Sequence, residues 1–349
     1  MGAESEKRIY VVETKTTSED CSLGSVYWKR ISIDVQVSMY IVALRALGYD
    51  VSGVIYDVLR KVDQEPLKAT PPESRKYTKP TKSDPVSRLY ANQREVDETP
   101  EEYGARCLAA IVANPEKYYQ RGVVTRLESE RYEASQDTWQ TAQTLRDARR
   151  LKVFPRNPDA CMQWSRACDY LSVCCGEASI DDPVLFQKEE KKHTELDLNG
   201  IGNDSFGLDG TVVYGKGSAG ELELLTQSSL RTFRSCHRRY FYRYEMQVRP
   251  LKLKAEPLRQ GSSVHNGIEV LAKTGDLQLA LDALDKEDPY ANAKERAMLT
   301  GYYARWGSPT GVIAVEKEWT MDLVNPETGA NSKTFRLGGK IDRLIEVGA

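Results

Sequence analysis

The sequence predicts an α/β fold with a mixed central β-sheet, flanking helices and a helical accessory region. Residues 9–12 (Ile-Tyr-Val-Val) and 51–61 are rich in β-branched and aromatic residues, and the segment between them repeats apolar residues at helical spacing. A strand, a helix and a strand at this spacing predict a right-handed parallel crossover. Two further strand-like segments, residues 311–323 and 335–347, follow a long helical region and are expected to complete the sheet.

Length and composition are those of a soluble globular protein. The 349 residues allow one large domain with an accessory part or two domains, and the 40% hydrophobic and 29% charged content is ordinary. We expect no membrane span, no signal peptide and a cytoplasmic location, where the seven cysteines stay reduced. A net charge of −2 gives no global sign of nucleic-acid binding, so any such site must be a local patch.

The first strand ends in polar residues. Because side chains two apart on a strand share a face, Glu13 and Lys15 are expected to project together at its end. Residues 18–30 are expected to form a loop, and residues 33–47 a helix that ends at Gly48. Gln36 and Tyr40, four residues apart, then share one face of this helix.

The middle of the chain is more polar. The pattern predicts an exposed loop over 62–84, a helix from Thr99-Pro100-Glu101-Glu102 to about 113, a strand over 122–129 and a long helix over 130–151. A cysteine run, an acidic surface excursion over 177–203 and a Gly-rich linker over 215–220 follow. Helices are then expected at 230–244, from Gly261 onward and through about 306.

Four short motifs in this sequence resemble those of the RecB-like branch of the PD-(D/E)XK nuclease superfamily, which includes CRISPR-adaptation, AddB-like and phage recombination exonucleases. They are Gly261-x-x-x-His265, Gly339-x-Ile341-Asp342-Arg343, Glu13-x-Lys15 and Gln36-x-x-x-Tyr40. The resemblance implies a restriction-endonuclease-like core. Singly each motif is weak, since Glu-x-Lys pairs are usually solvated strand edges and a lone His is more often a capping or surface residue than a ligand.

The motifs do not follow the order of the family, in which His and Asp precede Glu-x-Lys and Gln-x-x-x-Tyr. A circular permutation restores that order, whether it is engineered, a rotated record of a natural chain or a naturally permuted gene. Residues 221–349 are then the first half of the nuclease core and 1–160 the second half, with the cysteine segment and acidic tail at 161–214 and a linker at 215–220.

The residue types suit metal-dependent phosphodiester hydrolysis. Asp342 and Glu13 supply the oxygen ligands that Mg²⁺ or Mn²⁺ prefers, and His265 is a possible further ligand that would favour Mn²⁺. Lys15 is expected to orient or deprotonate the attacking water and to offset phosphate charge. Gln36 and Tyr40 are expected to contact DNA phosphate or to support Lys15. Glu316 and Glu318 lie on a predicted strand nearby, where a solvent-facing salt-bridge role is expected.

The cysteines follow a pattern that the resemblance links to an iron–sulfur cluster. Members of the family that carry a cluster pair three late cysteines with one early one, which here implies a [4Fe–4S] cluster on Cys161, Cys168, Cys174 and Cys236. The six-residue interval after Cys161 departs from the usual spacing of two. Structural zinc on four cysteines is the alternative, and buried free thiols are expected at Cys21 and Cys107.

A basic and aromatic stretch is the candidate DNA-binding surface. Arg231, Arg234 and Arg238 recur at helical spacing, and four aromatic residues lie between 240 and 244. Such a surface suits backbone contact and base stacking, although the same rings could belong to the core.

We therefore expect a metal-dependent DNA nuclease, specifically an exonuclease of recombination, repair or CRISPR adaptation. Its expected substrates are single-stranded DNA or duplex ends, and its expected protein partners come from the recombination or CRISPR-adaptation pathways. The alternatives are a catalytically silent DNA-binding scaffold of the same fold and a zinc-stabilised interaction protein.

Overall fold

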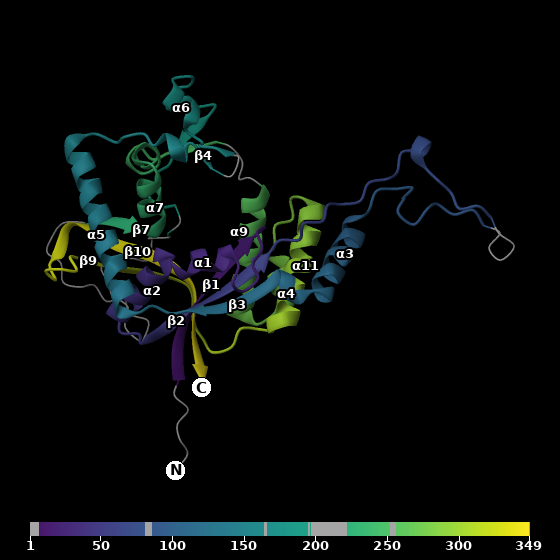
Figure 1. The fold of residues 1–349 in the computed structure, drawn as a ribbon, viewed down its shortest axis with the longest axis horizontal. Helices are drawn as coiled ribbons and strands as arrows, with labels where there is room; N and C mark the ends of the chain where they lie inside the picture. Colours follow the sequence, from purple (N-terminus) through teal and green to yellow (C-terminus); the bar gives the residue numbers. More distant parts are fainter. Residues whose placement is uncertain are drawn as a thin grey trace, which may run out of the picture.

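The computed structural model describes residues 7–80, 86–163, 166–194, 196, 222–251 and 256–348, so the expected linker at 215–220 lies outside it. Within these residues a six-stranded sheet forms the centre of the molecule (Figure 1). Its strands are β1 (Lys7–Thr17), β2 (Val51–Arg60), β3 (Tyr119–Val124), β7 (Glu223–Thr226), β9 (Val312–Val324) and β10 (Asn331–Gly348).

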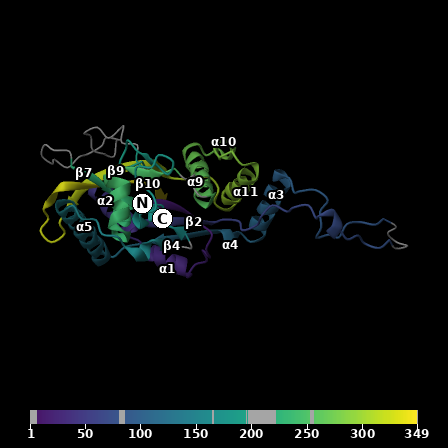
Figure 2. The ribbon, with the colours of Figure 1, turned by 90° about the horizontal axis from the view of Figure 1, so that it is seen from above.

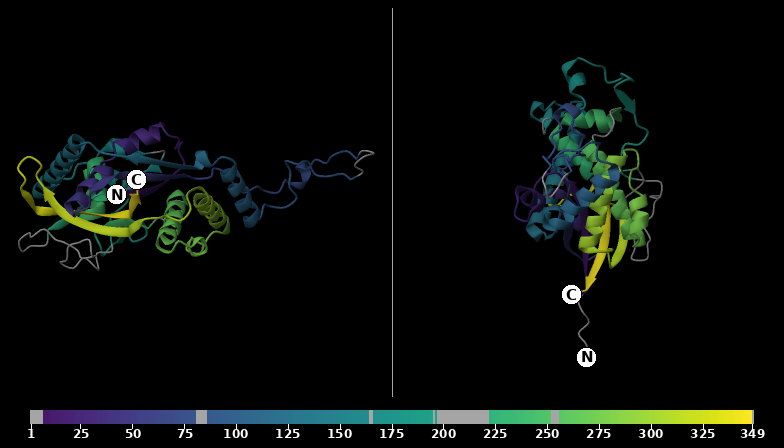
Figure 3. Two further views of the ribbon diagram at one scale, coloured as in Figure 1. Left: turned by 90° about the horizontal axis from the view of Figure 1, so that it is seen from below. Right: turned by 90° about the vertical axis from the view of Figure 1, so that its right-hand side faces the viewer.

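The sheet is mixed, as predicted, and it joins the two halves of the sequence. The strand order is β3-β2-β1-β10-β7, with β9 also paired to β10. β1 runs parallel to β2, which confirms the parallel pairing of the predicted crossover, and antiparallel to β10. Lys7 pairs with Gly348, so the first described residue of β1 lies beside the end of β10. The right-hand view of Figure 3 shows the yellow end of β10 at one edge of the molecule, and this end pairs with the start of β1.

Most predicted helices are present, with the differences at their ends. The helices are α1 (Val26–Ser32), α2 (Val35–Ala46), α3 (Pro100–Ala113), α4 (Pro115–Tyr118), α5 (Glu128–Leu151), α6 (Leu171–Cys175), α7 (Gln227–Ser235), α8 (His237–Tyr240), α9 (Glu256–Thr274), α10 (Leu277–Asp282) and α11 (Pro289–Trp306). The Thr99 side chain accepts a hydrogen bond from the Glu102 backbone, which forms the predicted cap of α3.

Three expectations about helices were wrong. The expected loop over 18–30 contains most of α1, whose Trp28 is buried against Gly122 of β3. The helix expected over 230–244 is interrupted at Cys236 and ends in a π-helical turn, Phe241–Glu245. α9 begins before Gly261, so His265 lies inside a helix instead of at its start.

Two hydrophobic clusters hold the helices on the sheet. The larger one packs α1, α2, α5 and α7 against strand residues such as Val11, Val54 and Ile341. The second joins α3, α9, α10 and α11 to Leu59 of β2 and Tyr119 of β3. Because Val58 belongs to the first cluster and Leu59 to the second, the two clusters cover opposite faces of β2.

Smaller elements complete the described chain. A third cluster around Tyr170 and Phe186 joins α6 to a two-stranded sheet, β6 (Phe186–Lys188) and β8 (Val248–Pro250). The expected excursion over 177–203 thus contributes one short strand. A second small sheet is formed by β4 (Met162–Gln163) and β5 (Arg166–Ala167). The segment between β2 and α3 extends away from the sheet (Figures 1 and 2). In the described part of the chain, every helix is too short or too polar to cross a lipid bilayer.

Candidate active site

The candidate site lies where β1 and β10 separate. Their antiparallel pairing ends at Val12 and Arg343, so Glu13 and Asp342 are the next residues on facing strands. The Thr14 backbone N–H donates to Asp342 Oδ2 at 2.8 Å, which ties the two strands together at this point. Glu13 is 3% exposed. Two carboxylates from opposite ends of the sequence are therefore held side by side in a largely buried place.

A third carboxylate lies on the other side of Asp342. Ile341 pairs with Lys317 and Arg343 with Val315, so Asp342 lies opposite Glu316 of β9. Glu316 has a φ of 52°, a conformation that is rare for a non-glycine residue and that re-aims side chains at irregular points in strands. Its side chain is 12% exposed and forms an ion pair with Lys340. The salt bridge was expected, but the solvent-facing position was wrong.

His265 reaches the carboxylates from α9. A Cβ on Gly261 would lie 2.7 Å from Thr16 Oγ1, so the glycine allows α9 to approach β1 closely. His265 Nε2 lies 3.0 Å from Glu316 Oε1 and 3.7 Å from Asp342 Oδ1. Ligand atoms of His265, Glu316 and Asp342 all lie within 4.8 Å of one another. His265 and Asp342 were predicted from the sequence as metal ligands, whereas Glu316 was not.

Lys15, Gln36 and Tyr40 form a chain of hydrogen bonds beside Glu13. Lys15 Nζ donates to Glu13 Oε1 at 2.5 Å and to Gln36 Oε1 at 3.2 Å. The Gln36 amide donates to Glu13 Oε1 at 3.0 Å and to the Tyr40 hydroxyl. Tyr40 is 5% exposed, and its hydroxyl donates to the Lys340 carbonyl at 3.1 Å. Of the two roles expected for Gln36 and Tyr40, these contacts match support of Lys15.

Burial and neighbouring charges set the protonation of the site. Burial, together with the charge of Glu13, raises the pKa of Asp342 to about 7. Burial alone would lower the pKa of Lys15, but the adjacent Glu13 outweighs it and the pKa is raised. For Glu316, burial alone would raise the pKa, but hydrogen bonds from His265 and Lys340 outweigh burial, and the pKa is lowered. Lys15 is therefore a stable positive charge beside Glu13, and the charge of Glu13 disfavours ionisation of Asp342.

The raised pKa of Asp342 predicts that the metal-free protein loses stability as pH rises. An unfolded Asp titrates near ~3.9, so the contribution is complete below that pH and is lost as pH rises through about 7. At one pKa unit per ~1.4 kcal/mol, the loss is at most about 4 kcal/mol. In EDTA, Asp342→Asn should therefore unfold at higher urea concentration than the wild type at alkaline pH, and the difference should vanish in acid. Equal stability of the two proteins at alkaline pH would contradict this.

The residues present fit a hard divalent cation. Glu13 Oε2 is buried and has no hydrogen-bond partner, while its other oxygen accepts from Lys15 and Gln36. An unpaired buried carboxylate oxygen is costly unless a cation or water satisfies it. Carboxylates with one imidazole form a donor set that suits Mg²⁺ or Mn²⁺. Glu13, Asp342 and His265, with Glu316, are the residues that would hold the ion.

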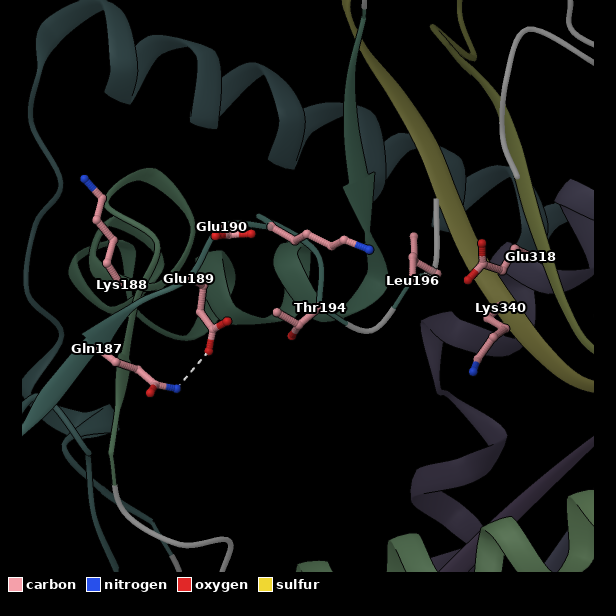
Figure 4. Close-up of a pocket in the computed structure, with 9 residues that line it drawn as sticks. Gln187, Lys188, Glu189, Glu190, Thr194, Leu196, Glu318 and Lys340 are labelled. Atoms are coloured by element: carbon pink, nitrogen blue, oxygen red, sulfur yellow. Dashed lines mark hydrogen bonds between the residues drawn. The ribbon is translucent and has the colours of Figure 1, made fainter. Parts of the chain in front are cut away.

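Two cavities adjoin these residues. One of about 200 Å³ is lined by Glu13, Gln36, Tyr40 and Asp342 among others. A larger one of about 640 Å³ opens beside it, and both are lined by Lys340. Figure 4 shows Lys340 and Glu318 on one side of the larger cavity and the 187–190 segment on the other. An open, mainly polar cavity therefore adjoins the smaller cavity at the site.

A buried ionic network lies on the opposite face of the same strands. Asp57 of β2 is 1% exposed and accepts from Arg121, from the Tyr302 hydroxyl at 2.8 Å and from Arg343 at 3.0 Å. Arg343 also donates to Thr14 Oγ1 at 3.2 Å. Arg343 follows Asp342, and Thr14 lies between Glu13 and Lys15. The network therefore fixes the backbone that carries the site.

The predicted cluster cysteines come from two segments that lie together. Asn157 Nδ2 donates to the Ser235 carbonyl at 2.8 Å, and the Cys168 backbone donates to the Cys161 carbonyl at 2.8 Å. Burial raises the pKa of Cys161 and Cys174, and both thiols also sense Cys168 and Cys236. The four predicted cysteines therefore lie in the same region of the molecule. Cys21 and Cys107 are buried free thiols, as expected.

The basic and aromatic stretch separates into two parts. Its tyrosines are buried core residues: Tyr240 is 0%, Tyr242 7% and Tyr244 1% exposed. They form no base-stacking surface, and the core alternative is the correct one. Arg231 is exposed, Arg234 donates to Thr141, and Arg238 donates to the Phe154 carbonyl.

The comparisons with known proteins give one match. No curated protein and no solved structure matches the chain significantly. One family model matches residues 224–349. This region includes His265, Glu316 and Asp342. Glu13, Lys15, Gln36 and Tyr40 lie outside it. The mixed α/β fold described above is consistent with the restriction-endonuclease-like fold of the matching family. Residues 224–349, about a third of the chain, match the family model of the PD-(D/E)XK nuclease superfamily.

Proposed function

We propose that this protein is a Mg²⁺- or Mn²⁺-dependent deoxyribonuclease whose site is completed by residues outside the matched domain. The observation that carries the proposal is the meeting of Glu13 and Lys15 on β1 with Asp342 on β10. Nuclease superfamily membership of the matched region implies a nucleic-acid substrate.

Each residue has a separate task in this proposal. A divalent cation held by Asp342, Glu13 and His265 would offset charge on the phosphate and lower the pKa of a water molecule. Lys15, whose pKa is raised, stays protonated, so it orients the attacking water and offsets phosphate charge instead of removing a proton. Gln36 holds both Lys15 and Glu13, and Tyr40 holds Gln36.

The substrate and pathway follow from the resemblance of the motifs to RecB-like nucleases. We propose exonuclease action in recombination, repair or CRISPR adaptation, on single strands or duplex ends. Arg231, Arg234 and Arg238 are proposed to contact the DNA backbone, since Arg231 is exposed on α7.

The experiment is cleavage of end-labelled single- and double-stranded DNA by the purified protein. Cleavage is expected with Mn²⁺ or Mg²⁺ and none with EDTA. Progressive loss of nucleotides from linear DNA, with closed circular DNA left intact, is expected of an exonuclease. Absence of cleavage with either metal would overturn the proposed function, and nicking of closed circles would overturn its exonuclease form.

We also propose that the chain is a circular permutant of the family's usual order. The pairing of Lys7 with Gly348 supports this, because a short connection could join these neighbouring strand ends. A protein made with residues 221–349 placed before 4–214 should unfold at the same temperature and cleave DNA at the same rate. Failure of the rearranged chain to fold would contradict the permutation.

Finally, we propose a [4Fe–4S] cluster on Cys161, Cys168, Cys174 and Cys236, supported by the electrostatic influence of Cys168 and Cys236 on both Cys161 and Cys174. Anaerobically purified protein is expected to be brown and to contain iron and sulfide. Cys236→Ala should lose the colour and the iron, while Cys107→Ala, which changes a buried thiol elsewhere, should keep both. Colourless protein containing zinc would favour the structural zinc alternative.

A further inference from the structure

A long arm projects from the molecule between β2 and α3. We define it as residues 70–94, of which the structure describes 70–80 and 86–94. Figures 1 and 2 show it extending beyond α3, away from the sheet. The candidate site makes no use of it.

The two sides of the arm run antiparallel and meet in one isolated β-bridge, between Tyr77 and Leu89. Its two sides are joined by backbone hydrogen bonds from Thr70 to Arg94 at 2.8 Å, from Thr78 to Arg88 at 2.7 Å and from Tyr90 to Lys76 at 3.0 Å. The Gln93 side chain accepts from the Lys76 backbone and donates to the Ser74 carbonyl. These cross-links hold the arm in one shape although it has almost no hydrophobic core.

The base of the arm is fastened to the body. Glu98 is 2% exposed and accepts from the Leu67 backbone at 2.8 Å and from Arg106 of α3. The hydrogen bonds from Arg106 lower the pKa of Glu98 to about 2, so this carboxylate stays charged and paired at neutral pH. These hydrogen bonds attach the base of the arm to α3, which packs against α11.

The composition of the arm differs from that of the rest of the chain. It has six Lys and Arg residues against two Asp and Glu, whereas the whole chain has 49 against 51. Lys76 and Lys79 are exposed, and Tyr77 and Tyr90 expose 46% and 44% of their surface. The arm is thus basic and exposes aromatic rings, while the rest of the chain is acidic. Its charge is complementary to that of a polyanion.

We propose that the arm is a second DNA-binding element, which grips the phosphodiester backbone at a distance from the candidate site. This rests on the proposed nuclease function for the identity of the polyanion. The exposed lysines can contact the phosphates of duplex and single-stranded DNA alike, and the exposed tyrosines can stack on the bases of a single strand. DNA bound at the candidate site contacts the arm only if it is long enough to extend from the site to the arm.

The test measures binding of labelled DNA by fluorescence anisotropy, in EDTA so that cleavage does not interfere. Lys76→Ala/Lys79→Ala is compared with Lys29→Ala/Lys333→Ala, which removes the same charge from exposed lysines outside the arm. With long DNA, the arm variant should bind more weakly, and its slope of log affinity against log salt should be lower by about 1.8, or 0.9 for each lost phosphate contact. With short DNA the two variants should bind alike.

Equal affinity and equal salt slope for the two variants on long DNA would overturn the proposal. The arm would then be assigned to binding of a protein partner. Parallel measurements with single-stranded and duplex DNA show which form the arm holds. The outcome is separate from that of the cleavage experiment: an inactive wild type whose arm variant loses affinity refutes the nuclease function alone. An active wild type whose arm variant binds like the control refutes the arm alone.

Discussion

Lys15→Ala is expected to lower the rate of DNA cleavage by about 10²–10⁴-fold while leaving divalent-metal binding in place. The lysine donates to Glu13 and Gln36 and has a raised pKa, so in the proposed mechanism it is a fixed positive charge that would face the scissile phosphate. It is not among the residues expected to hold the metal. Single-turnover cleavage gives the rate, and calorimetric titration with Mn²⁺ gives the affinity.

The control for this prediction is Lys29→Ala, which removes an exposed lysine on α1. It should cleave DNA at the wild-type rate. If Lys15→Ala loses metal binding in parallel with cleavage, the separate roles given to Lys15 and the carboxylates are wrong. If it cleaves like the wild type, the proposed site is wrong.

The largest loss of stability is expected from Asp57→Asn. Asp57 receives hydrogen bonds from Arg121, Tyr302 and Arg343, and Arg343 is 3% exposed. Removing the carboxylate charge leaves the Arg343 guanidinium buried without a counter-ion. Breaking a buried ion pair in this way costs about 3–5 kcal/mol, which is measurable as a lower midpoint of urea unfolding.

A matched control exists on the loop that leads into the same strand. Asp50 is fully exposed and lies 3.8 Å from Arg45, so Asp50→Asn should change the free energy of unfolding by less than about 1 kcal/mol. A similarly small change in Asp57→Asn would mean that the network does not hold the strands together. Since Thr14 and Arg343 flank the site residues, the folded Asp57 variant should also bind Mn²⁺ more weakly.

The centre of the fold could be predicted from the sequence because its elements carry strong local patterns. β1, α2 and β2 combine an apolar run, a helical repeat and a glycine stop, and the structure has all three. α1 could not be found in the same way. It is a single short helix whose Trp28 is buried by contact with Gly122, a residue distant in sequence.

The candidate site shows the same division. Glu13, Lys15 and Asp342 have recognisable neighbours in the sequence, but Glu316 lies in the alternating segment Val315-Glu316-Lys317-Glu318, where nothing distinguishes it from Glu318. Only the register of β9 against β10 and its positive φ bring Glu316 to Asp342. The stretch around Tyr240 and Tyr244 was predicted as a candidate DNA-binding surface, but its tyrosines are buried. A dense group of aromatic residues is compatible with either a core or a surface, so the sequence could not decide between them.

The central claim is that residues from the two ends of the chain form one metal centre. The most direct measurement is the position of Mn²⁺ in crystals of the protein, located by its anomalous scattering. We expect a peak at bonding distance, about 2.0–2.2 Å, from carboxylate oxygens of both Asp342 and Glu13, where Glu13 Oε2 has no hydrogen-bond partner. A peak that Glu13 does not contact, or no peak at these residues, would contradict the claim.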